Sequence, residues 1–172
     1  MINHNLTNRY YNKIKVKNNK NFGYLDWPSK KRQVKEFKIL TTIINEKKFS
    51  ILDYGCGMGD LIFFLKNKPY KYLGYDINHK FISFCKKKFK KKNYFFYNSP
   101  KIKKCTVDYI IASGTFSVKG KNSKYSWEKY FYNSMNYFTK ISKKGFAINV
   151  HDDVCPISKQ KKHIYFANLN KI

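Results

Sequence analysis

The sequence places glycine at three alternate positions, Gly55, Gly57 and Gly59, directly after a short apolar run. The run, residues 49–54, has the length and composition of a buried parallel strand, and a helical pattern follows the glycines. Because glycine has no Cβ atom, the backbone can turn sharply after the strand and let a ligand lie against it. The acidic residue before the glycines, Asp53, suits a cationic ligand better than a pyrophosphate. The loop therefore predicts a ligand site at a strand-to-helix turn; a tight turn with packing glycines is the alternative.

The rest of the chain alternates short apolar runs with amphipathic segments. Amphipathic spacing predicts helices over residues 30–47, 60–68, 79–91 and 126–141, and apolar runs predict strands over 71–76, 94–97, 107–112 and 145–150. We expect Asn78 to cap the helix at 79–91. This alternation is typical of an α/β fold, in which helices flank a parallel sheet through right-handed crossovers.

Ligands of such sheets lie beyond the carboxyl ends of the strands, where the strand order reverses, so we expect function in the loops after the strands. Asp76 ends the second strand, 17 residues after Gly59, and a carboxylate there can accept both hydroxyl protons of an adenosine ribose. The alternative role for Asp76, a helix cap, competes with Asn78. The spacing G-x-G-x-G differs from the G-x-G-x-x-G of dinucleotide sites, so a nicotinamide-dependent oxidoreductase is a minor alternative.

The Asp-x-Gly-x-Gly-x-Gly loop at 53–59, together with Asp76, resembles class I S-adenosylmethionine-dependent methyltransferases. The resemblance extends over roughly residues 27–168. It implies an α/β, Rossmann-like three-layer sandwich with a mostly parallel sheet, and S-adenosyl-L-methionine as the cofactor.

The resemblance also implies roles for individual residues. Gly55 to Gly57 line the methionine part of the cofactor, Asp53 lies near its amino group, and Asp76 holds the ribose. Asn98 stands where the family often has an acid that bonds the adenine amine, and an amide oxygen can do the same. Residues 108–116 resemble the fourth-strand motif, whose final residues face the transferred methyl group. The predicted cofactor-binding residues are Asp53, Gly55, Cys56, Gly57, Gly59, Asp76, Ile77, Asn98, Ser113 and Gly114.

Two further stretches bear on the methyl acceptor. The fourth-strand motif lacks the Asn/Asp-Pro-Pro-Tyr signature of enzymes that methylate the exocyclic amines of bases, which disfavours a nucleic acid. Residues 23–27, with Gln33, Phe37 and residues 113–119, resemble a small subgroup of methyltransferases without an assigned substrate. Trp27 is expected either to cover the ligand pocket or to anchor the leading helix.

A general base is needed only for a weakly nucleophilic acceptor, because the methyl group of the cofactor is already activated. His151 follows the fifth strand at the functional end of the sheet and is the predicted base; a solvated loop histidine is the alternative. The four histidines are scattered, and the four cysteines form no C-x-x-C pair, so no metal site is expected. We expect reduced, mostly buried thiols at Cys56, Cys85, Cys105 and Cys155.

The formal net charge of +26 invites a nucleic-acid partner, because lysines neutralise phosphates. Arginine, however, stands only at Arg9 and Arg32, and the abundant lysine, asparagine, isoleucine, tyrosine and phenylalanine all have A/T-rich codons. Coding drift is therefore the favoured explanation of the charge, and selection for a polyanionic partner is the alternative. A methyltransferase acting on a small-molecule or saccharide-like acceptor is the favoured function. The alternatives are an RNA methyltransferase and a catalytically silent module that binds the cofactor or a partner.

The two ends of the chain carry separate expectations. Residues 1–21 are polar, with little periodicity, and are predicted to form an arm or loose cover; residues 22–172 are predicted to form one methyltransferase domain. No apolar run approaches the roughly 20 residues that cross a bilayer, and a cytoplasmic protein is expected. Only 22 residues follow Val150, too few for the antiparallel strands that usually close the family's sheet. We expect the fifth strand to form an open edge for another copy or a partner, and activity to depend on how this edge is completed.

Overall fold

The computed structural model describes residues 3–13, 25, 27–65, 67–98, 105–168 and 170. The described helices are α1 (His4–Lys13), α3 (Lys30–Leu40), α4 (Asp60–Phe64), α5 (His79–Lys88) and α6 (Lys124–Ile141), with the short 3-10 turns η1 (Thr41–Ile43) and η2 (Ile157–Lys159). The strands are β1 (Ser50–Tyr54), β2 (Lys71–Tyr75), β3 (Tyr94–Tyr97), β4 (Val107–Ala112), β5 (Ser142–Ile148), β6 (His151–Asp152) and β7 (Phe166–Ala167). None of the helices in these ranges combines the length and apolarity that a bilayer crossing requires.

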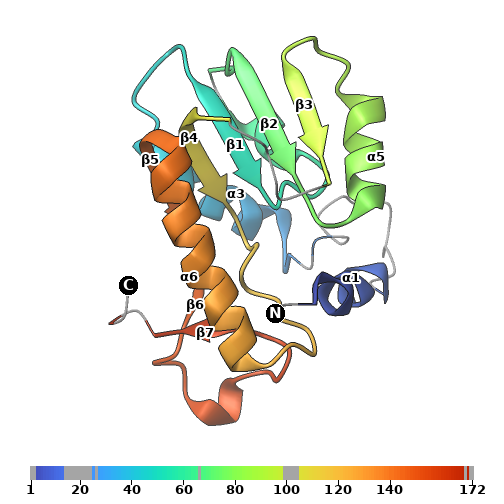
Figure 1. The fold of residues 1–172 in the computed structure, drawn as a ribbon, viewed down its shortest axis with the longest axis vertical. Helices are drawn as coiled ribbons and strands as arrows, with labels where there is room; N and C mark the ends of the chain where they lie inside the picture. The colour runs from blue at the N-terminus through green and yellow to red at the C-terminus, as the bar shows by residue number, and fades with distance from the viewer. Residues whose placement is uncertain are drawn as a thin grey trace.

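Five parallel strands form the central sheet in the order β3-β2-β1-β4-β5. The chain order reverses between β1 and β4, which is where a doubly wound sheet binds its ligand. Helix α6 covers one face over β4 and β5, and α3 lies behind the sheet (Figure 1). The arrowheads of the strands point toward the end of the molecule at which α1 lies (Figure 1). The predicted Rossmann-like three-layer sandwich is confirmed.

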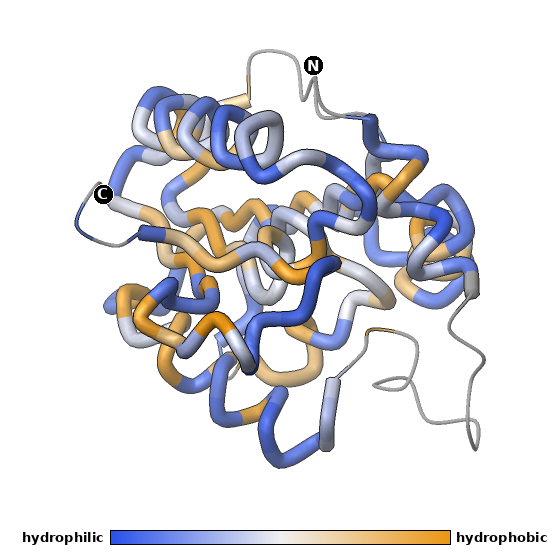
Figure 2. Tube along the Cα trace, turned by 90° about the horizontal axis from the view of Figure 1, so that it is seen from below, coloured by the Kyte–Doolittle hydropathy of each residue, from blue (hydrophilic) through white to orange (hydrophobic). Residues whose placement is uncertain are grey.

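Alternate residues of the strands build a separate core on each face. On β1, Ile51 packs with α3, α4 and α5, whereas Leu52 and Tyr54 pack with α6. The central strands are buried on both faces, as their continuous apolar runs predict. Seen along the strands, hydrophobic segments gather in the interior and hydrophilic segments surround them (Figure 2).

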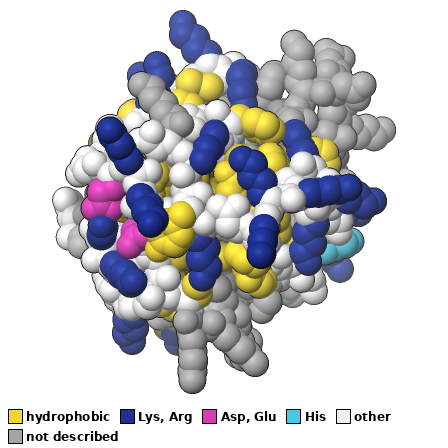
Figure 3. Space-filling model, turned by 90° about the horizontal axis from the view of Figure 1, so that it is seen from above, with side chains coloured by type: hydrophobic (Ala, Val, Ile, Leu, Met, Phe, Trp, Pro, Cys, Tyr) yellow, Lys and Arg dark blue, Asp and Glu magenta, His cyan; other side chains and the backbone are white. Residues whose placement is uncertain are grey.

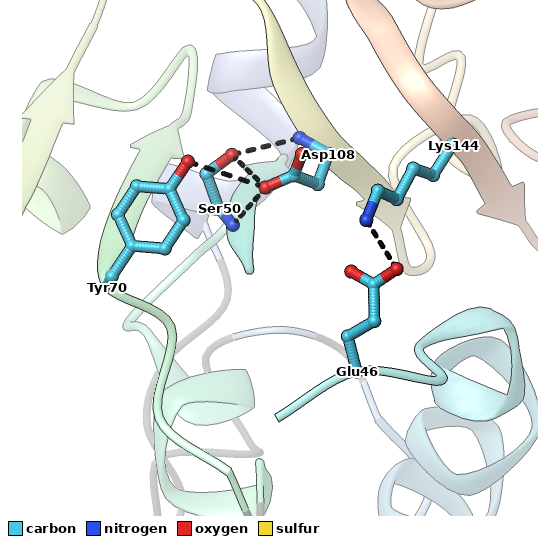
Figure 4. Close-up of polar contacts among 5 residues, drawn as sticks. All are labelled: Glu46, Ser50, Tyr70, Asp108 and Lys144. Atoms are coloured by element: carbon cyan, nitrogen blue, oxygen red, sulfur yellow. Dashed lines mark hydrogen bonds and ion pairs between the residues drawn. The ribbon is translucent and has the colours of Figure 1, made fainter. Parts of the chain in front are cut away.

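A hydrogen-bond network joins the amino ends of β1 and β4, at the opposite end of the sheet from the glycine loop (Figure 4). The Asp108 carboxylate accepts hydrogen bonds from the backbone N–H and the hydroxyl of Ser50, both at 2.7 Å. The Asp108 N–H donates in turn to the Ser50 hydroxyl at 2.9 Å. Burial acts to raise the pKa of Asp108, but the two bonds from Ser50 and the positive charges of Lys144 and Lys143 together lower it. Nearby, Lys144 pairs with Glu46.

Several elements differ in length from their predictions, for identifiable reasons. Helix α3 ends at Leu40 because β-branched residues follow, and the hydroxyl of Thr41 bonds back to the Phe37 carbonyl at 2.7 Å. Helix α4 ends at Phe64, and the Lys68 ammonium donates hydrogen bonds to the Ile62 and Leu65 carbonyls at this end. Strand β5 begins three residues earlier than predicted, because an edge strand tolerates polar side chains such as those of Ser142 and the exposed Lys143 and Lys144.

The amino-terminal region departs most from its prediction. Residues 4–13, expected to be part of a loose polar arm, form the regular helix α1, and Thr7 on this helix is 2% exposed. Residues 14–24, which include Gly23 and Tyr24, lie outside the described residues. The proposed division of the chain at residue 21 therefore stays a prediction.

Candidate cofactor and active site

The glycine loop turns sharply at the carboxyl end of β1. Gly55, Gly57 and Gly59 all have left-handed backbone conformations, with φ angles of 83°, 52° and 76°. The N–H groups of Gly55 and Cys56 donate to the Tyr75 carbonyl at 2.7 and 2.8 Å, which fastens the turn to the end of β2. A Cβ atom on Gly55 would lie 2.2 Å from the Thr115 hydroxyl oxygen. The alternate glycines are therefore required by both the turn and its close neighbours.

Asp76 joins the ends of β1 and β2 through its carboxylate. One oxygen accepts the Gly57 N–H at 2.9 Å and the other accepts the Asn78 N–H at 2.8 Å. The Asn78 side chain accepts the Lys80 N–H and so caps α5, as predicted, which leaves Asp76 free of that role. Burial raises the pKa of Asp76 to about 6, although the two backbone bonds act in the opposite direction.

Asp53 is the second carboxyl group at this edge of the sheet, and it lies near the end of β1, two residues before Gly55. It is 3% exposed and accepts a hydrogen bond of 2.5 Å from the Tyr72 hydroxyl. Burial raises its pKa to about 7, with smaller contributions in the same direction from Asp76 and Asp60, while the Tyr72 bond lowers it. Asp53 is thus a buried group that is poised between its neutral and negative forms near pH 7.

A cavity opens at the carboxyl end of the sheet and encloses about 660 Å³ of empty space, part of which is open to solvent. Its lining residues are His4, Thr7, Tyr11, Leu25, Trp27, Gly55, Gly57, Tyr75, Asp76, Ile77, Phe81, Ser113, Gly114, Thr115, Trp127 and Tyr130. Of the residues predicted from the sequence, the structure brings together Gly55, Gly57, Asp76, Ile77, Ser113 and Gly114.

Four other predicted cofactor residues and the predicted base are not part of this lining. Asp53 is buried against Tyr72, and Phe89 and Cys85 fill the space beside Gly59. The Cys56 side chain is buried, and burial raises the pKa of its thiol. Asn98 is exposed. His151 lies on β6 with its ring 5.4 Å from that of Phe166, outside the described lining, so the structure does not bring it to the cavity.

The sequence did not identify the wall that α1 contributes to the cavity. His4, Thr7 and Tyr11 are spaced by three and four residues, so they occupy one face of the helix. This spacing was the available signal. The aromatic residues Trp127 and Tyr130 on α6 were also missed, because a core position on an amphipathic helix explains them equally well.

Positive charge is abundant on the surface but absent from the described lining of the cavity. None of those lining residues is Lys or Arg. Figure 3 shows the face opposite α1, where Lys and Arg side chains are scattered and hydrophobic side chains lie between them. On this face the lysines do not gather into a single stripe.

The sequence matches a family model described as "Methyltransferase domain" over residues 45–165. The chain belongs to this methyltransferase family. A curated relative, "Putative methyltransferase Rv1506c" from Mycobacterium tuberculosis (strain ATCC 25618 / H37Rv), is 28% identical over 123 residues, which cover 70% of this chain and 74% of the relative.

Solved structures share the fold of this methyltransferase. Magnesium protoporphyrin IX methyltransferase (ChlM) from Synechocystis PCC 6803 with bound SAH has a TM-score of 0.69 at 13% identity, covering 98% of this chain and 84% of that chain. Mycolic acid cyclopropane synthase CmaA1 complexed with SAH and CTAB has a TM-score of 0.56 at 14% identity, covering 85% of this chain and 53% of that chain. At these identities the likeness shows the fold alone.

The protein is a class I S-adenosylmethionine-dependent methyltransferase, and the described residues fit that cofactor. Three positions on the lining, Gly55, Gly57 and Gly114, have no Cβ atom, and the Asp76 carboxylate on the same lining suits ribose hydroxyls. On the lining, the buried hydroxyl of Ser113 has no hydrogen-bond partner among the described residues. Buried polar groups rarely stay unpaired, so this hydroxyl indicates a polar ligand. When bound, S-adenosylmethionine supplies a methyl group activated by its sulfonium.

Proposed function

We propose that this methyltransferase transfers its methyl group to a hydroxyl of a small, uncharged molecule of saccharide-like or phenolic character. The observation that carries the proposal is the lining of the cavity, in which aromatic and hydroxyl side chains dominate and none of the described residues is Lys or Arg. An acceptor with phosphates would meet no lining cation there. Flat or sugar-like rings instead stack on aromatic side chains and bond their hydroxyls.

The lining supports a division of the cavity into two parts. Gly55, Gly57 and Asp76 suit the methionine and ribose parts of the cofactor, and Ile77 and Phe81, beyond Asp76, suit an apolar adenine face. The second part comprises the segment 113–115 after β4, Trp127 and Tyr130 near the start of α6, and Trp27. We assign this second part to the acceptor.

Aromatic side chains near the acceptor part would also exclude water. Trp127 is 1% exposed and donates its indole N–H to the Phe116 carbonyl at 2.9 Å, so its ring is held in place. Trp27 lies close to Gly114, where a Cβ atom would be 3.5 Å from its ring. Fixed walls of this kind align an acceptor with an activated methyl group, which is the main task of the protein in such a reaction.

The first experiment measures cofactor binding. The two tryptophans of the chain, Trp27 and Trp127, both line the cavity, so intrinsic fluorescence should change on addition of S-adenosylmethionine or S-adenosylhomocysteine. Calorimetry gives the affinity, with NADH as the control ligand. Absence of binding to both sulfur compounds would refute the assignment of the cavity.

The second experiment identifies the acceptor class. The protein is incubated with methyl-labelled S-adenosylmethionine and a panel of phenols, saccharides, carboxylic acids and RNA, and the label in each product is measured. We expect label in uncharged hydroxyl compounds. Label in RNA, with binding that falls steeply as salt rises, would contradict the proposal and indicate a nucleic-acid acceptor. Cofactor binding without transfer to any class would indicate a silent module.

A further inference from the structure

We infer that helix α1 forms the acceptor-side wall of the cavity and that His4 accepts the proton of the acceptor hydroxyl during methyl transfer. The inference rests on the proposed function, because it assumes a hydroxyl acceptor. It concerns an element that lies outside the residues matched by the family model, 45–165. The proton acceptor would therefore be supplied by a helix outside the residues that the family model matches.

Hydrogen bonds fasten α1 across the carboxyl end of the sheet. At its start, the Asn3 N–H donates to the Asn122 side chain at 3.0 Å. In its middle, the Asn8 side chain donates to the Ile77 carbonyl at 3.1 Å. Near its end, the Asn78 side chain donates to that of Asn12 at 3.2 Å. These contacts join α1 to the loops after β2 and β4. These two strands lie on either side of β1, the strand that the glycine turn follows.

Aromatic contacts fix the direction in which α1 crosses the cavity. His4 meets Tyr130 of α6 edge to face, with ring centroids 5.3 Å apart and an interplanar angle of 83°. Tyr11, at the other end of the same helix face, meets Phe81 of α5 at 6.4 Å. Since Phe81 lies at the adenine end and Tyr130 at the acceptor end, His4 is the α1 residue nearest to the proposed acceptor.

The chemistry of the lining singles out His4 as a proton acceptor. Burial lowers the pKa of His4, so the imidazole is neutral at pH 7. No hydrogen bond involves its ring among the described residues, which leaves a nitrogen lone pair available. The other titratable groups of the lining are less suited. Burial raises the pKa of Tyr75 and of Tyr130, and the Asp76 carboxylate is held by two backbone N–H groups.

The proposed step balances without a further reactant. The acceptor oxygen attacks the methyl carbon, and the new C–O bond forms as the bond between that carbon and sulfur breaks. The electron pair of the broken bond stays on sulfur, which becomes a neutral thioether. The hydroxyl proton passes to the free nitrogen of His4, and the imidazolium later releases it to solvent. His4 thereby removes the positive charge that would otherwise develop on the acceptor oxygen.

Nuclear magnetic resonance of the four histidines tests the placement without an acceptor. The pKa of each histidine is measured with saturating S-adenosylmethionine and, separately, with saturating S-adenosylhomocysteine, which differ by the methyl group and one positive charge. A positive charge about 6 Å away should lower the pKa of His4 by about half a unit or more, even in a water-like dielectric. His79, which is exposed at the start of α5, should titrate equally with both compounds.

The outcomes separate the inference from the proposed function. If both compounds bind and His4 titrates identically with them, His4 is remote from the reacting sulfur and the inference is wrong. If neither compound binds, the cofactor assignment itself fails. The His4 resonance is identified as the one that is missing from the spectrum of His4→Gln. If that variant does not fold, Gln variants of the other three histidines identify their resonances, and the remaining one belongs to His4.

A kinetic comparison then tests the proton transfer with any hydroxyl compound of the panel that is methylated. His4→Gln should lower kcat by about 10²- to 10⁴-fold, leave the affinity for S-adenosylhomocysteine within about threefold, and abolish the fall in rate on the acid side of the pH profile. His79→Gln should retain the wild-type kcat. A loss of this size in His151→Gln, with His4→Gln unaffected, would overturn the inference and return the role to the residue predicted from the sequence.

Discussion

Replacing Asp53 with Asn should alter stability and cofactor affinity in opposite directions at pH 8. The carboxyl group is buried, and among the described residues the hydroxyl of Tyr72 is its hydrogen-bond partner. Burial raises its pKa from 3.8 to about 7. Because the folded state then holds the proton more tightly than the unfolded chain does, this group's contribution to stability is complete below pH 3.8 and is lost as the pH rises to about 7.

The magnitude follows from that pKa change. A rise from 3.8 to about 7 corresponds to at most roughly 4 kcal/mol of unfolding free energy lost at pH 8. Asp53→Asn cannot ionise and keeps an oxygen for Tyr72, but it buries an amide N–H₂ without a partner, at a cost of about 1–3 kcal/mol. The variant should therefore be less stable than the wild type near pH 4 by about 1–3 kcal/mol and more stable at pH 8 by a similar amount.

Urea unfolding followed by tryptophan fluorescence, from pH 4 to pH 8, measures this crossing, and calorimetry at pH 8 measures S-adenosylmethionine affinity. We expect the affinity of Asp53→Asn to fall about tenfold or more, because a negative charge near the cationic ligand is removed. Asp108→Asn is the matched control at the other end of the sheet. Its pKa is lowered in the fold, so its contribution to stability is present above pH 3.8 and is lost as the pH falls. A stability difference between Asp53→Asn and wild type that does not vary with pH would refute the reasoning.

Three further substitutions test the remaining contacts of the site. Asp76→Asn should weaken S-adenosylhomocysteine binding by about 100-fold, since hydrogen bonds to a charged acceptor contribute about 1.5–3 kcal/mol each. A dissociation constant from calorimetry that stays within about threefold of the wild-type value would contradict this. Gly55→Ala places a Cβ atom 2.2 Å from the Thr115 hydroxyl at a φ of 83°, and we expect a loss of about 2 kcal/mol or more in urea unfolding. Gln33→Ala removes the 2.9 Å amide bond to buried Asp60 and should cost about 1–3 kcal/mol without changing cofactor affinity.

Local chemistry made the framework of the fold predictable. The glycine turn, the cap at Asn78 and the strand at 94–97 each depend on residues close together in the sequence, and all three are confirmed. The helix ends were predicted less well, because they depend on partners that only the fold supplies. The Lys68 ammonium, which ends α4, reaches back to carbonyls that no sequence pattern reveals.

The site was predictable only where it is built from the loops after the strands. Helix α1 was missed because its stability comes from distant partners, such as Asn122 and the stacked ring of His163 against Tyr10 at 5.2 Å, rather than from a hydrophobic stripe. His151 was favoured because it follows a strand at the functional end. Strand β5, however, is at the edge of the sheet, beyond β4, and the ligand site lies between β1 and β4.

The arrangement of Asp53 and Asp76 explains how a residue outside the cavity lining can still act on the cofactor. Both carboxyl groups are almost fully buried, and the charge of Asp76 is one cause of the raised pKa of Asp53. Gly55 follows Asp53 by two residues, and Gly55 and Gly57 line the cavity. A cationic ligand that lies against these glycines favours the ionised forms of both carboxyl groups and lowers their pKa values. The binding of S-adenosylmethionine should therefore release protons near pH 6.5, and its enthalpy should depend on the ionisation heat of the buffer, which calorimetry in two buffers of equal pH can measure. Equal enthalpies in the two buffers would mean that the carboxyl groups do not sense the ligand.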